Sequence, residues 1–196
     1  MADLPSSPGL PAGSDAPAAR GERLRLATVW LGGCSGCHMS FLDLDERLLA
    51  LAPRIDLVYS PLADIKTFPA RVDVALVEGA VATSDHLELI YTVRARTRVL
   101  VAFGDCAVTG NVTAMRNPIG PAAVLQRAYV ETASAGAGPP DDVLVPKLLA
   151  RVVPVHHVVP VDVWLPGCPP SADVIYAVLT DLLAGRPPAT GGLRFG

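Results

Sequence analysis

The sequence predicts an α/β protein, a flavodoxin-like doubly wound three-layer sandwich with a mainly parallel sheet. From residue 24 onward, short apolar runs alternate with stretches of helical periodicity, which is typical of βαβ units. Of the 196 residues, 51% are hydrophobic and 18% are charged, as a sheet covered on both faces requires. We therefore expect five strand-helix steps in one domain over residues 22–196, most simply in the flavodoxin-like strand order.

Five short apolar runs are the expected strands of this sheet. They lie at residues 24–30, 55–60, 72–79, 98–104 and 161–167. The helix expected at 39–52 has one apolar face, formed by Phe41, Leu44, Leu48 and Leu51.

Two further helices have recognisable ends. One is expected to begin at Ser84 as N-cap, and the last to begin after Ser171 and to end at Gly185. Residues 109–120 and 136–142 are expected to be irregular, because glycine and proline interrupt regular structure there.

Composition and charge exclude several classes of function. Residues 1–21 are rich in Pro, Ala, Gly and Ser, so they are expected to form a flexible tail, and without an export signal we expect a cytoplasmic protein. A net charge of -3 argues against nucleic acid as a partner. No apolar run approaches the roughly 18 residues of a membrane span, so the excess apolar surface suggests an obligate protein partner.

The four cysteines all follow expected strands. Cys34 and Cys37 follow the first strand, Cys106 the fourth and Cys168 the fifth. Because the carboxyl ends of parallel strands lie along one edge of the sheet, four thiols from distant parts of the chain are expected at one edge. Glycines beside each cysteine would let the backbone approach a large anionic group closely.

Several uses of these thiols remain open from spacing alone. Disulfides and thioredoxin-like chemistry fit poorly with a cytoplasmic chain and four convergent cysteines. Structural zinc usually takes two short-spaced cysteine pairs in a small domain, whereas this chain has one such pair. A [4Fe-4S] cluster needs four thiolates and accepts scattered ligands, so spacing favours iron-sulfur over zinc.

Four stretches of the sequence resemble the small, electron-transferring subunit of [NiFe] hydrogenases. They are WLGGCSGCHMSFLDLDERLL, LVEGAV, VAFGDCAVTGNV and LPGCPP followed by SAD, in the order and spacing of that family. The resemblance implies that Cys34, Cys37, Cys106 and Cys168 bind one [4Fe-4S] cluster, the one nearest the nickel-iron site of a large subunit. That nickel-iron site would lie on the other chain.

The length of the chain and the stretches DLDERLL and TAMRNP are similar to the cytoplasmic bidirectional, NAD-reducing members of this family. The resemblance implies a one-cluster subunit that works with diaphorase subunits containing FMN and further iron-sulfur clusters. The quinone-facing subunit of respiratory complex I also shares the fold and the GCPP stretch. It has two adjacent cysteines where this chain has CSGC, which argues against quinone chemistry.

Glu78 and His38 are the other residues expected near the site. Glu78 ends the third strand and could relay protons or have only a structural role. His38 follows Cys37 and could support the cluster or move protons, although a helix-start histidine facing the partner is the simpler interpretation. Because the loop where a flavodoxin holds phosphate contains Cys34 and Cys37, we expect no FMN in this chain.

Overall fold

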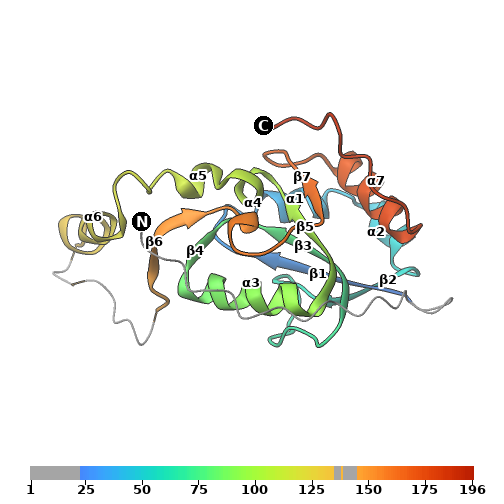
Figure 1. Ribbon diagram of the computed structural model, residues 1–196, viewed down its shortest axis with the longest axis horizontal. Coiled ribbons are helices and arrows are strands. Elements are labelled where there is room, and N and C mark those ends of the chain that lie inside the picture. Colours follow the sequence, from blue (N-terminus) through green and yellow to red (C-terminus); the bar gives the residue numbers. More distant parts are fainter. Residues whose placement is uncertain (1–22, 135–137, 139–144) are drawn as a thin grey trace.

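A five-stranded parallel sheet forms the centre of the molecule (Figure 1). The structure is a computed structural model that describes residues 23–134, 138 and 145–196. The strand order is β2-β1-β3-β5-β7, so the predicted α/β fold and flavodoxin-like order are confirmed. The strands are β1 (Leu24–Trp30), β2 (Ile55–Tyr59), β3 (Val72–Glu78), β5 (Thr97–Phe103) and β7 (Val163–Leu165).

The central strand β3 shows why apolar runs predict this sheet well. All seven of its residues are buried, and it pairs with β1 on one side and β5 on the other. Because side chains alternate along a strand, Val74 and Leu76 join one hydrophobic core while Ala75 and Val77 join the other. A strand buried on both faces must be apolar at nearly every position, which is the pattern of residues 72–77.

Helices cover both faces of the sheet and complete the three layers (Figure 1). On one face, Ile90 and Val93 of α3 pack against the sheet, and Thr83 caps that helix by accepting from the His86 amide at 3.3 Å. On the other face, α1, α2 and α7 bury their apolar sides. The helices are α1 (Gly36–Leu42), α2 (Glu46–Leu51), α3 (Ser84–Arg96), α4 (Asp105–Thr109), α5 (Asn111–Ala114), α6 (Pro121–Gln126) and α7 (Ala172–Leu183).

Two helix predictions need correction, one at its end and one in its middle. The cap of α3 is Thr83 rather than Ser84, while Ser171 caps α7 as predicted. The helix predicted at 39–52 is broken into α1 and α2 by a turn that ends at Asp45, whose φ is +50°. Aspartate tolerates positive φ and competes with helical hydrogen bonds, so the DLD stretch interrupts the helix.

The passage predicted as irregular at 109–120 is helical in part, and residues 115–119 form turns. It contains the end of α4 and all of α5, and α6 follows it and continues into the π-helical turn η1 (Arg127–Glu131). Outside this passage, β4 (Val81–Thr83) and β6 (Leu148–Val153) pair as a small antiparallel sheet. After β6, η2 (Val155–His157) is a short 3-10 turn. The predicted tail at 1–21 and nearly all of 136–142 lie outside the described residues.

None of the helices in the described part of the chain is long and apolar enough to cross a membrane.

Candidate cluster site at the carboxyl edge of the sheet

All four cysteines lie just beyond the carboxyl ends of sheet strands, as predicted. Cys34 follows β1, Cys37 is in the first turn of α1, Cys106 is in α4 after β5, and Cys168 follows β7. All four are free thiols, with Cys37 and Cys106 buried and the other two exposed. The parallel sheet therefore brings together cysteines that are separated by up to 134 residues in the chain.

The thiols are close enough to influence one another's ionisation. Burial raises the pKa of Cys37 well above its ordinary value, and the carboxylate of Glu78 and the thiols of Cys106, Cys34 and Cys168 raise it further. A thiol in this environment stays protonated near pH 7 unless a cation compensates its charge. A group bound by these sulfurs as thiolates must therefore supply compensating positive charge.

Glycine backbone is packed directly against the cysteine loops. A Cβ at Gly104, where φ is +83°, would lie 2.1 Å from Cys37 Sγ. A Cβ at Gly79, where φ is +89°, would lie 2.8 Å from the carbonyl oxygen of Gly32. The approach at Gly104 places backbone against a sulfur, and the Gly36 amide donates to Cys34 Sγ at 3.4 Å.

The number and type of the donors at this edge match a [4Fe-4S] cluster, which takes four thiolates. Across residues 23–134, 138 and 145–196, no three His, Cys, Asp or Glu side chains are arranged to hold one metal ion. Tetrahedral zinc needs four sulfurs about 2.3 Å from one centre, whereas a [4Fe-4S] cluster spreads its four thiolates over four irons. Four free thiols around a glycine-lined edge provide the donor set for the second arrangement.

Glu78 and His38 form a buried pair beside the cysteines. Glu78 ends β3 and its Oε2 accepts from the backbone N–H of His38 at 2.9 Å and contacts His38 Nδ1. Both side chains are 2–3% exposed, so His38 does not face a partner, contrary to the simpler prediction. Its Nε2 is buried without a hydrogen-bond partner among the described residues. The pair fixes the first turn of α1, which contains Cys37, against the end of β3.

Asp105 is a site residue that sequence reasoning missed. Its side chain is buried, with Oδ1 accepting from the Gly167 amide at 2.6 Å and Oδ2 from the Gly196 amide at 2.9 Å. It therefore connects the loop of Cys106 to the loop of Cys168. The sequence hinted at this role through the position of Asp105 directly before Cys106. The two glycines whose amides donate to its carboxylate are 62 and 91 residues away, so the hydrogen bonds could not be predicted.

Replacing Asp105 with asparagine is expected to lower the free energy of unfolding by about 1–3 kcal/mol. The side-chain NH2 group would take the place of one acceptor oxygen, which leaves a loop amide unpaired. A urea titration followed by circular dichroism measures the change. Asp64→Asn is the control, because Asp64 is exposed and pairs with Lys66, which is also exposed, and it should leave the midpoint unchanged. Equal midpoints for both variants would contradict the linking role of Asp105.

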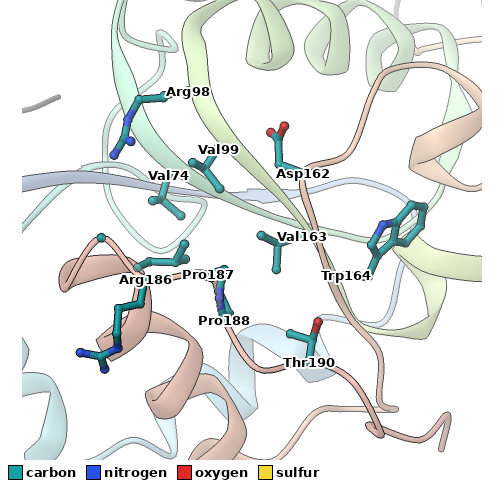
Figure 2. A pocket seen from close by; sticks show the side chains of 12 residues that line it. Val74, Arg98, Val99, Asp162, Val163, Trp164, Arg186, Pro187, Pro188 and Thr190 are labelled. Atoms are coloured by element: carbon teal, nitrogen blue, oxygen red, sulfur yellow. The ribbon is translucent and has the colours of Figure 1, made fainter. Parts of the chain in front are cut away.

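Cavities lie near both ends of the sheet. One of about 230 Å³ lies beside Cys168 and is lined by residues 166–171 together with Val174, Leu193, Arg194 and Gly196. Another, of about 360 Å³, lies near the amino ends of β5 and β7 (Figure 2). Its wall includes Arg186, which pairs with Asp181, and Asp162, which pairs with Arg94. No cysteine lines this second cavity, so we give it no part in the site.

Comparisons with known proteins agree with this geometry. The family model described as NADH ubiquinone oxidoreductase, 20 Kd subunit, matches residues 34–182. The NAD-reducing hydrogenase HoxS subunit delta of Cupriavidus necator is 41% identical over 192 residues, which cover 94% of this chain and 89% of that subunit. A hydrogenase subunit of Methanococcus voltae is 37% identical over 169 residues, which cover 85% of this chain. The chain spans only 58% of the length of that second relative.

A solved structure supports the same relationship. A chain in the crystal structure of an NAD+-reducing [NiFe]-hydrogenase in the H2-reduced state superposes with a TM-score of 0.85 and 43% sequence identity. The match covers 89% of this chain and 100% of that chain. The chain therefore belongs to the small-subunit family of NAD-reducing [NiFe] hydrogenases, within the wider family of the 20 Kd subunit of NADH ubiquinone oxidoreductase.

Proposed function

We propose that this chain relays electrons, through one [4Fe-4S] cluster, between the nickel-iron site of a hydrogenase large subunit and the diaphorase subunits of a cytoplasmic, NAD-reducing complex. The observation on which this rests is the edge of the sheet where four free thiols gather, two of them against glycine backbone. The hydrogenase relatives, one of them named an NAD-reducing hydrogenase subunit, support the reaction and the partners.

The residues proposed to bind the cluster are Cys34, Cys37, Cys106 and Cys168. When bound, the cluster would accept and release one electron at a time. The protein's part is to hold the four sulfurs in place, to keep water from two of them by burial, and to direct N–H groups at sulfur. Proton relay stays one of two predicted roles of Glu78; its hydrogen bonds to His38, which hold α1 against β3, support the other, structural role.

The large subunit is proposed to cover the apolar surface beside the cysteine loops. Trp30 at the end of β1, Met39 in α1, and Met115 and Ile119 after α5 are 45–72% exposed. Trp30 and Met39 flank the stretch that contains Cys34 and Cys37. Met115 and Ile119 follow α5, which is joined to that stretch by the hydrogen bond that Thr113 donates to the Gly32 carbonyl at 2.8 Å. Exposed aromatic and methionine side chains of this kind are enriched in protein interfaces.

Replacing Met115 with glutamate is expected to weaken association with the large subunit at least about tenfold, because an unpaired charge would be buried in the interface. Leu49→Glu is the matched control: Leu49 is similarly exposed, 75% against 72% for Met115, but lies in α2. Co-purification of the large subunit with each variant measures the effect. Equal recovery with both variants would place the interface elsewhere.

Hydrogen-dependent reduction of NAD by the complex, purified anaerobically through a tag on this chain, tests the proposed function. Activity, together with a [4Fe-4S] signal and no FMN bound to this chain, would support it. The match to the 20 Kd subunit family favours a second candidate, electron delivery to a quinone. Quinone reduction without hydrogen activity would select that candidate, and bound zinc without iron would select a zinc-stabilised interaction module.

A further inference from the structure

The side chain of Asn111 lies against one of the cysteines. Its Nδ2 is 3.5 Å from Cys168 Sγ, within hydrogen-bonding distance for sulfur, although the two residues are 57 positions apart. The backbone of Asn111 is fixed independently, because its N–H donates to Thr109 Oγ1 at 3.3 Å. Thr109 Oγ1 in turn donates to the Asp105 carbonyl at 2.9 Å. The amide group of Asn111 is thus held beside the sulfur by the end of α4.

Helix capping does not explain the side chain at position 111. Asn111 has a φ of +31°, a conformation that asparagine tolerates and that glycine adopts without cost. The N-cap of α5 is Gly110, and no side-chain cap hydrogen bond is formed there. Glycine at 111 would satisfy the backbone equally well but would lack the amide that faces Cys168.

We propose that Asn111 is a positioning residue that donates an N–H···S hydrogen bond to Cys168 and thereby raises the reduction potential of the cluster. This inference rests on the proposed function, since it needs a cluster bound by Cys168. Reduction adds negative charge to the cluster and its sulfurs, so a donor stabilises the reduced state more than the oxidised state. Because Cys168 is exposed, this bond also competes with water for the sulfur.

Two substitutions separate the donor from the backbone conformation. Asn111→Gly keeps positive φ and removes the donor, whereas Asn111→Asp keeps the shape, removes the donor and adds a negative charge. We expect the equilibrium for cluster reduction to become up to about tenfold less favourable in Asn111→Gly, which corresponds to about 59 mV for one electron. Asn111→Asp should shift it further in the same direction.

The measurement is a redox titration of the intact complex, followed by the electron paramagnetic resonance signal of the reduced cluster. Iron content per complex is measured in parallel, and it should be unchanged in Asn111→Gly. A cluster of full iron content whose potential is unchanged in both variants would overturn the inference and leave the proposed function standing. Absence of any [4Fe-4S] signal from the unsubstituted complex would overturn both.

Discussion

Replacing Cys106 with alanine is expected to abolish hydrogen-driven NAD reduction by the intact complex. Cys106 is buried in α4, directly after β5, and the chain has only four cysteines, so no other thiol can replace it. A [4Fe-4S] cluster needs a ligand for each iron, and loss of one ligand at the buried side would remove the cluster or one of its irons.

Three measurements distinguish this outcome from a folding defect. Turnover reports the relay, iron per complex reports the cluster, and thermal unfolding reports the fold. Because alanine removes only a small buried sulfur, we expect the variant to remain folded while iron and turnover fall together. Near-normal turnover in Cys106→Ala would remove the proposed relay role from this chain.

Gly104→Ala is expected to lower the affinity for the cluster, or the activity that depends on it, by about 10- to 100-fold. The new Cβ would lie 2.1 Å from Cys37 Sγ, so either the buried thiol or the backbone before Cys106 must move. Both movements displace a proposed ligand. Iron content and hydrogen-driven NAD reduction of the purified complex measure the effect.

Gly120→Ala is the control for backbone strain. Gly120 has nearly the same conformation as Gly104, with φ and ψ of 83° and 159° against 83° and 163°. A Cβ at Gly120 meets nothing within 4 Å. Both variants carry the strain of a glycine-only conformation, but only Gly104→Ala meets a sulfur. Equal loss of iron in the two variants would mean that strain, rather than contact with Cys37, is responsible.

The sheet could be predicted from the sequence because its strands are encoded locally. In a chain of this size, a mainly apolar run such as 72–77 most readily forms a strand that is buried on both faces. The prediction of one helix at 39–52 was wrong in its middle. Apolar periodicity shows which residues face the core, and because α1 and α2 bury their apolar residues in the same core, it does not reveal the break between them. The turn at Asp45 interrupts the helix without disturbing the apolar pattern.

The passage at 109–120 shows the opposite failure. Its glycines and proline predict irregular structure, yet the end of α4 and all of α5 form there. The side chain of Asn117 accepts from and donates to the backbone of Val152 at 2.7 and 2.8 Å, and Arg116 donates to the carbonyl oxygen of Ala82 at 2.9 Å. Contacts with the small antiparallel sheet thus stabilise turns whose local propensity is low.

By itself the sequence determined the parallel sheet and the placement of four cysteines at one edge, while the strand order was only the simplest of the possible orders. Those features follow from apolar periodicity and from the rule that parallel strands end on the same side. Only the tertiary structure decided which polar groups support the cysteines: Glu78 with His38, Asp105 with Gly167, and Asn111 with Cys168. These pairs join residues 40–62 positions apart, and a hydrogen bond depends on distances of a few tenths of an ångström that only packing of the whole chain establishes.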